Sequence, residues 1–160
     1  MPCYLFTYHA YGSWMPDRLQ GYVQRKQGIL PPDAVLAQKY RAAMEQSEAK
    51  FTSDVQIALI DSLLESREKQ SFQLYFVATD ITHVHAVVGW RDNRKWLRMR
   101  STIKGSLSRY LNGNIERREW FVDGGSRRHV NEQEHFDYLV VKYLPRHNGW
   151  KWSPEKGKFR

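Results

Sequence analysis

Two histidines that are one residue apart are the residues of this sequence best suited to chemistry. His83 and His85 flank Val84 within residues 71–90, a stretch rich in β-branched and aromatic residues. Side chains of a strand alternate between its two faces, so both imidazoles point to the same face of a sheet. Two imidazoles on one face can bind a divalent metal ion. The competing interpretation is a pair of ordinary polar residues on a half-buried strand.

The composition of the chain favours nucleic acid as its partner. The 160 residues carry a formal net charge of +8, and the isoelectric point is near 9.7. Most of the basic excess lies in residues 91–128, directly after the histidine pair. A polyanion is the natural partner of such a protein, and nucleic acid is favoured over a membrane surface. Cys3 is the only cysteine, which excludes an internal disulfide and a thiolate metal site. With no membrane-spanning apolar run and no signal-peptide pattern, we expect a cytoplasmic protein.

The hydrophobic pattern predicts one α+β domain over residues 1–160, with an enlarged loop and helix inserted at about residues 12–50. The expected strands are residues 4–11, 72–79, 83–90, 120–122 and 126–130. The expected helices are residues 33–50, 53–68 and 95–111, and a last helix that follows Asn131 as its N-cap. This order matches the ferredoxin-like split βαβ plan, an antiparallel sheet, with an added C-terminal helix that carries tyrosines.

Four features of the chain stand out on that plan: the His83-Val84-His85 motif, the basic helical segment 104–109, the segment 120–128 and the terminal helix with its tyrosines. Together they resemble the HUH-type single-tyrosine transposases. That family includes the REP-associated tyrosine transposases and the transposases of insertion-sequence-200-like elements. The resemblance covers most of the chain, from about residue 4 to residue 149.

The resemblance implies an enzyme that nicks and rejoins single-stranded DNA bearing hairpins. In such enzymes Mg²⁺ or Mn²⁺, held by the two histidines and a polar side chain of the tyrosine helix, polarises the scissile phosphate. The tyrosine hydroxyl then attacks, which leaves a 5′-phosphotyrosine and a free 3′-hydroxyl. The resemblance also implies a homodimer that is associated with the nucleoid.

The resemblance places the nucleophile at Tyr143, with Tyr138 as the alternative. The segment that begins at Tyr143 resembles the family's tyrosine-then-glutamine segment. It assigns the third metal ligand to Asn148, with His147 as the other possibility. Pro145 is expected to distort the helix between the tyrosine and this ligand. The two tyrosines are five residues apart, a spacing that does not share one face of an α-helix.

Basic residues between the histidines and the last helix are expected to contact the DNA backbone. They are Arg98, Lys104, Arg109, Arg127 and Arg128. Two other functions stay open. One is a catalytically inactive or domesticated relative that binds hairpin DNA or RNA without cutting it. The other is an unrelated metal hydrolase, which would need carboxylate ligands close to the histidines.

Overall fold

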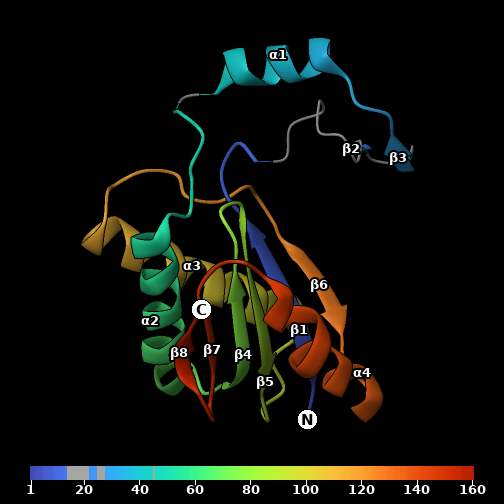
Figure 1. Ribbon diagram of the computed structural model, residues 1–160, viewed down its shortest axis with the longest axis vertical. Coiled ribbons are helices and arrows are strands. Elements are labelled where there is room, and N and C mark those ends of the chain that lie inside the picture. Colours follow the sequence, from blue (N-terminus) through green and yellow to red (C-terminus); the bar gives the residue numbers. More distant parts are fainter. Residues whose placement is uncertain (14–21, 25–27, 45) are drawn as a thin grey trace.

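The fold is described from a computed structural model, which covers residues 1–13, 22–24, 28–44 and 46–160 (Figure 1). The strands are β1 (Cys3–His9), β2 (Tyr22–Gln24), β3 (Gly28–Leu30), β4 (Gln73–Thr79), β5 (His83–Gly89), β6 (Ser126–His129), β7 (Lys151–Ser153) and β8 (Gly157–Phe159). The α-helices are α1 (Ala34–Ala43), α2 (Ser53–Lys69), α3 (Trp96–Asn114) and α4 (Gln133–Asp137). A π-helix, η1 (Tyr138–Tyr143), and a 3₁₀ turn, η2 (Leu144–Arg146), continue directly from α4.

The main sheet has the strand order β6-β1-β5-β4-β7-β8, and every neighbouring pair is antiparallel. Helix α2 leads from β1 to β4, β4 and β5 form a hairpin, and α3 leads from β5 to β6. The first four strands of this order therefore have the split βαβ arrangement, with β1 and β5 in the centre. The predicted α+β fold with a ferredoxin-like antiparallel sheet is confirmed.

The two faces of the sheet are covered by different helices (Figure 1). Phe6 and Val84 point to one face, where they pack with Leu59 of α2 and Ile103 of α3 in the larger apolar cluster. The opposite face carries a smaller apolar cluster beneath the tyrosine helix, made of Leu5, Phe76, Ala78, Val87, Val130, Leu139 and Leu144. Strand alternation thus separates a structural face, under α2 and α3, from a face that η1 covers.

The inserted segment between β1 and α2 contains more structure than the predicted loop and helix. Strands β2 and β3 pair with each other, and Figure 1 shows α1 apart from the sheet, beyond the end of β1. Helix α1 begins as predicted, because the Asp33 carboxylate accepts a hydrogen bond of 3.0 Å from the Leu36 amide. It ends at Ala43, before the predicted residue 50. The chain beyond it returns to the body, where the Ala49 amide donates to the Tyr11 carbonyl at 2.8 Å.

Three further features differ from the sequence prediction. Residues 120–122 form a single bridge, between Phe121 and Ala10, instead of a strand. The last helix begins at Gln133, with Glu132 at its N-cap in place of Asn131. The hairpin of β7 and β8 was not predicted, since each strand has only three residues. Among the helices that the structure describes, none has the length and apolar character needed to cross a membrane.

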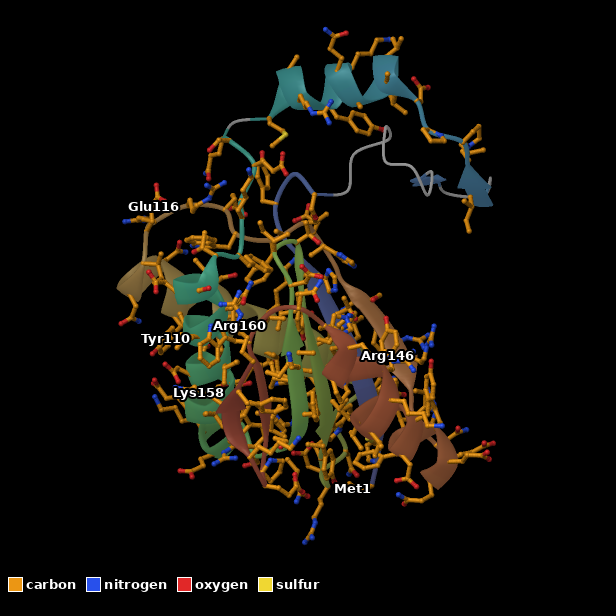
Figure 2. All side chains as sticks on the ribbon, in the orientation of Figure 1. Met1, Tyr110, Glu116, Arg146, Lys158 and Arg160 are labelled. Carbon is orange, nitrogen blue, oxygen red and sulfur yellow. The ribbon has the colours of Figure 1, made fainter. Side chains whose placement is uncertain are left out.

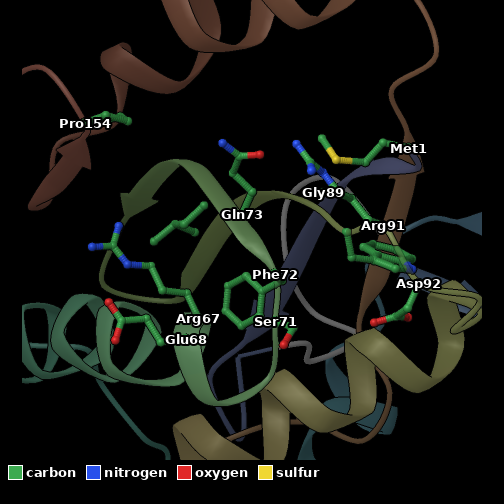
Figure 3. A pocket seen from close by; sticks show the side chains of 12 residues that line it. Met1, Arg67, Glu68, Ser71, Phe72, Gln73, Gly89, Arg91, Asp92 and Pro154 are labelled. Atoms are coloured by element: carbon green, nitrogen blue, oxygen red, sulfur yellow. The ribbon is translucent and has the colours of Figure 1, made fainter.

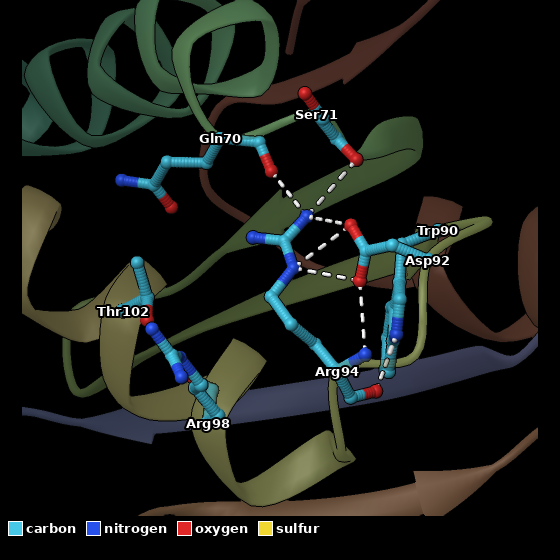
Figure 4. Close-up of polar contacts among 7 residues, drawn as sticks. All are labelled: Gln70, Ser71, Trp90, Asp92, Arg94, Arg98 and Thr102. Carbon is cyan, nitrogen blue, oxygen red and sulfur yellow. Dashed lines mark hydrogen bonds and ion pairs between the residues drawn. The ribbon is translucent and has the colours of Figure 1, made fainter.

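Arg94, in the segment before α3, forms hydrogen bonds to the turn between α2 and β4 (Figure 4). The Arg94 guanidinium donates to both carboxylate oxygens of Asp92, and to the carbonyls of Gln70 at 2.5 Å and Ser71 at 3.3 Å. Ser71 has φ of 55°, a left-handed conformation that costs free energy outside glycine. In addition, the Arg94 carbonyl accepts from Trp90 Nε1 at 2.8 Å. Arg94 therefore stabilises the strained turn between α2 and β4.

We expect Arg94→Ala to lower the free energy of unfolding by about 1–3 kcal/mol, because it removes charge-assisted hydrogen bonds to two backbone carbonyls. Urea denaturation of the metal-free protein measures this change. Arg91→Ala is the matched control, since Arg91 is an exposed arginine in the same connection. Equal midpoints for the two variants would contradict the role assigned to Arg94.

Candidate active site

Three histidines meet on the face of the sheet beneath the tyrosine helix. His83 and His85 lie on β5 one residue apart, with ring centroids separated by 4.7 Å. His147, which follows η2, has its ring centroid 4.7 Å from that of His85 and 5.5 Å from that of His83. One ligand atom of each ring lies within 4.8 Å of the others. Residues from two distant parts of the chain thus converge on one point.

The Nδ1 atom of each ring has a polar partner. His147 Nδ1 lies 3.1 Å from the Leu144 carbonyl, which only accepts, so this nitrogen carries the proton. His85 Nδ1 lies 2.6 Å from the hydroxyl of Thr7, its neighbour on β1, and His83 Nδ1 lies 3.1 Å from Thr82 Oγ1. A hydroxyl can accept as well as donate, so all three rings are compatible with a proton on Nδ1. The Nε2 atoms then remain as metal ligands.

Burial and mutual repulsion keep two of these rings neutral. The pKa of His85 is lowered to about 2, mainly by burial and in addition by the neighbouring rings of His83, His147 and His9. The pKa of His83 is also lowered, first by burial and then by His147, although the Asp80 carboxylate opposes this. Metals bind the neutral imidazole, so these rings are in the required state at neutral pH.

The lowered pKa of His85 predicts a pH-dependent stability in the metal-free protein. The unfolded chain, in which this histidine titrates near 6.5, binds more protons than the folded one between that pH and about 2. The contribution of neutral His85 to the free energy of unfolding is therefore fully present above pH 6.5. It is lost as the pH falls, by up to about 1.4 kcal/mol per pH unit. Urea midpoints between pH 7.5 and 5 should fall more steeply for the wild type than for His85→Asn. Parallel slopes would contradict this electrostatic picture.

The donor set fits a divalent transition metal. Three imidazoles suit Mn²⁺, Co²⁺, Ni²⁺ or Zn²⁺, whereas Mg²⁺ prefers oxygen ligands. Of the two predicted ions, Mn²⁺ is thus the better match. Asn148, the predicted third ligand, is exposed and lies next to His147 in the chain. The assignment of Asn148 as a ligand stays a prediction. His147, the alternative, lies close to His83 and His85.

Tyr143 lies beside the histidines, and Tyr138 lies against Tyr143. The ring centroid of Tyr143 lies 6.0 Å from that of His85 and 5.4 Å from that of His147. The rings of Tyr138 and Tyr143 are stacked, with centroids 6.2 Å apart and planes 22° apart. The side chains are accessible, because Tyr138 is 47% exposed and Tyr143 is 38% exposed. Tyr143 is the tyrosine in ring contact with two of the three histidines.

A π-helix is the reason that the two tyrosines share a face, and the prediction that they would not is wrong. In η1 the Leu144 amide donates to the Leu139 carbonyl five residues earlier, the pattern of a π-helix. Residues five apart then align, which stacks Tyr138 on Tyr143. Leu139 and Leu144 have the same spacing, and both are buried on the sheet. Pro145 follows this turn and has no amide hydrogen with which to extend the helix.

The predicted DNA-binding residues lie on both sides of the sheet. Arg98, Lys104 and Arg109 belong to α3, which covers the face opposite the histidines. Lys104 Nζ donates to the Val122 carbonyl at 2.6 Å, so this lysine also holds the segment before β6. Arg127 places its guanidinium 4.1 Å from the centroid of the Trp96 ring.

Arg128 lies on the histidine face. It is paired with Leu5 of β1, and directly opposed residues share a face of the sheet. Leu5 belongs to the apolar cluster beneath the tyrosine helix. Arg128 is exposed, and Arg146 of η2 extends from the same side of the molecule (Figure 2). Of the five predicted basic residues, Arg128 is therefore the one that shares a face with the candidate metal ligands.

A hollow lies at the other end of β5 from the histidines. Figure 3 shows the side chains that line it. It measures about 780 Å³, and its lining includes Arg67, Phe72, Gly89 and Arg91. Gly89 is the last residue of β5 and His83 is the first, so about 20 Å of strand separates them. The hollow is thus not part of the histidine site.

Comparison with known proteins gives structural similarity without sequence similarity. No family model matches the chain, and no curated protein matches it in sequence. Among solved structures, the chain is similar to a REP-associated tyrosine transposase bound to a REP hairpin, with a TM-score of 0.47 and 10% sequence identity. The alignment covers 87% of this chain and 62% of that one, which is less than two thirds of its length.

Proposed function

We propose that this protein is a metal-dependent transposase or strand-transferase that nicks and rejoins single-stranded, hairpin-bearing DNA through a covalent tyrosine intermediate. The observation that carries the proposal is the meeting of three imidazoles with two accessible tyrosines. The net charge of +8 supports a polyanionic substrate. The proposal includes a homodimer and a cytoplasmic, nucleoid-associated location, both of which follow from the family resemblance.

The proposed reaction exchanges one phosphodiester bond for another. The Tyr143 oxygen attacks the scissile phosphorus and loses its proton to solvent. The bond to the 3′ oxygen breaks, and that oxygen takes up a proton, which gives a 5′-phosphotyrosine and a 3′-hydroxyl. Attack by a 3′-hydroxyl on the phosphotyrosine reverses the exchange. Since the bond energy is conserved, no nucleotide cofactor is needed.

The residues of the site divide the remaining tasks. His83, His85 and His147 would hold the metal ion, which supplies Lewis-acid stabilisation of charge on the phosphate when bound. The Leu144 carbonyl fixes the His147 ring, and Thr7 supports the His85 ring through Nδ1. Tyr138 limits the rotation of the Tyr143 ring by stacking on it.

The proposal is tested with a labelled single-stranded hairpin DNA and Mn²⁺ on a denaturing gel. We expect a DNA-linked protein band that requires the metal and disappears in EDTA. The double variant His83→Ala/His85→Ala should lose the band while it still binds the hairpin. Hairpins from the DNA that flanks the gene are the first substrates to use. A band that persists in EDTA or in the double variant would contradict the proposal.

Hairpin binding without cleavage is the second candidate function. It is favoured by the position of Arg98 and Arg109 on the side of the sheet away from the histidines. A surface there can bind DNA or RNA whether or not the histidine site is active. The two functions differ in the covalent adduct, which only the enzyme forms.

We expect Arg128→Gln to weaken hairpin binding more than Arg127→Gln does. Arg128 lies on the histidine face, whereas Arg127 is stacked on Trp96. Loss of one phosphate contact should weaken binding by about three- to tenfold. It should also reduce the slope of log affinity against log salt concentration by about one. Fluorescence anisotropy from 50 to 300 mM salt measures both effects. A larger effect at Arg127 would place the strand on the other face.

A further inference from the structure

A buried lysine lies next to the histidine site. Lys151, the first residue of β7, is only 5% exposed. It is paired with Ala78 of β4, and Ala78 is paired with His85 of β5. Directly opposed residues project from the same face, so Lys151 lies on the histidine face in the same row as His85. The small side chain of Ala78 stands between them.

The ammonium group of Lys151 holds the backbone of the segment that carries His147. Nζ donates to the His147 carbonyl at 2.8 Å and to the Gly149 carbonyl at 2.9 Å. It also lies 5.6 Å from the centroid of the Phe159 ring. Within the described part of the chain, no ion pair joins Lys151 to a carboxylate. A buried ammonium group needs hydrogen-bond acceptors to offset its loss of water. For Lys151 these acceptors are the carbonyls of residues 147 and 149.

The far end of this segment is fixed separately. The Gly149 amide donates to the Thr79 carbonyl at 3.1 Å, and the Thr79 hydroxyl donates to the Trp150 carbonyl at 2.6 Å. A Cβ atom on Gly149 would lie 2.3 Å from the Thr79 carbonyl oxygen, so only glycine fits. These contacts attach residues 149 and 150 to β4. Lys151 supplies the contact to His147 itself.

We propose that Lys151 is a positioning residue for His147. Its ammonium joins the carbonyls of residues 147 and 149, and so holds the third imidazole against His83 and His85. The consequence for metal binding rests on the function proposed above. The effect on the backbone does not, because the hydrogen bonds are formed without a metal.

Hydrogen exchange of the metal-free protein tests the backbone effect. The His147 amide donates to the Leu144 carbonyl, and the Gly149 amide donates to the Thr79 carbonyl. Lys151→Met keeps the aliphatic stem and removes the ammonium, so we expect the His147 amide to exchange at least about tenfold faster. The Gly149 amide, which β4 holds separately, should change less. Lys158→Met is the matched control, since Lys158 lies on the same hairpin (Figure 2) and pairs with Asp61 of α2. Unchanged exchange at the His147 amide in a folded Lys151→Met would overturn the inference.

Metal binding is compared in a double-mutant cycle, because removal of a nearby positive charge by itself favours a cation. Co²⁺ affinity is measured for the wild type, Lys151→Met, His147→Ala and the double variant. If Lys151 acts by positioning His147, the substitution of Lys151 should be at least about tenfold more harmful when His147 is present. Equal effects in the two backgrounds would overturn the positioning role.

The two assays separate the possible failures. If the wild type binds no Co²⁺, the proposed metal site fails, while hydrogen exchange still decides whether Lys151 orders residues 147–149. Should Lys151→Met not fold, Lys151→Gln replaces it in both assays, because its side chain is polar but uncharged and one atom shorter, which weakens both hydrogen bonds.

Discussion

Tyr143→Phe is expected to abolish the covalent protein–DNA adduct, with a loss of at least about 10³-fold in its rate of formation. In the proposed reaction the Tyr143 hydroxyl is the nucleophile, and the phenylalanine ring keeps the ring contacts to His85 and His147. Tyr138→Phe keeps the stacked pair of rings and should change the rate by less than about tenfold. Quench-flow sampling on denaturing gels, at equal occupancy of the hairpin DNA, measures both rates.

The contrast between the tyrosines also shows which ring reacts. Loss of the adduct in Tyr138→Phe alone would move the nucleophile to Tyr138, whose ring is the more exposed of the two. Loss in both single variants would indicate that the stacked pair acts together. Circular dichroism and hairpin affinity serve as controls, since neither substitution removes a buried side chain.

His147→Ala is expected to weaken binding of Mn²⁺ or Co²⁺ by at least about 100-fold, because it removes one of the three proposed ligands. Asn148→Ala, one residue further along, should change the affinity by less than about threefold, since Asn148 is exposed. Isothermal titration calorimetry and the visible spectrum of bound Co²⁺ report affinity and ligand set. A large loss for Asn148→Ala with none for His147→Ala would return the third ligand to the residue predicted from sequence.

The order of the main elements could be predicted because each has a strong local signal. The apolar spacing of α2 and α3, and the short link between β4 and β5, determine the central part of the split βαβ sheet. The face of β5 that carries His83 and His85 follows from strand alternation alone. The hairpin of β7 and β8 has too few residues for any period to be apparent, and its role depends on pairing with β4.

The missing parts of the site depend on tertiary structure. The five-residue spacing of Tyr138 and Tyr143 does not place two side chains on one face of an α-helix, and the apolar pattern does not distinguish a π-helix from an α-helix. Thr7 reaches His85 only because β1 pairs with β5 in one register. His147 was an alternative to Asn148 because the resemblance allowed either residue at the place of the metal-binding side chain. His147 reaches the site because the chain leaves η1 through the turn η2, after which the His147 amide donates to the Leu144 carbonyl.

Mass-spectrometric mapping of the protein after reaction with hairpin DNA and Mn²⁺ tests the central claim most directly. Nuclease digestion of the adduct followed by proteolysis should leave a nucleotide on the peptide that contains Tyr143. The modification should be absent without metal and absent in His83→Ala/His85→Ala. If folded protein that binds both Mn²⁺ and the hairpin carries no nucleotide on any tyrosine, the claim of a tyrosine strand-transferase is contradicted, and binding without cleavage becomes the function.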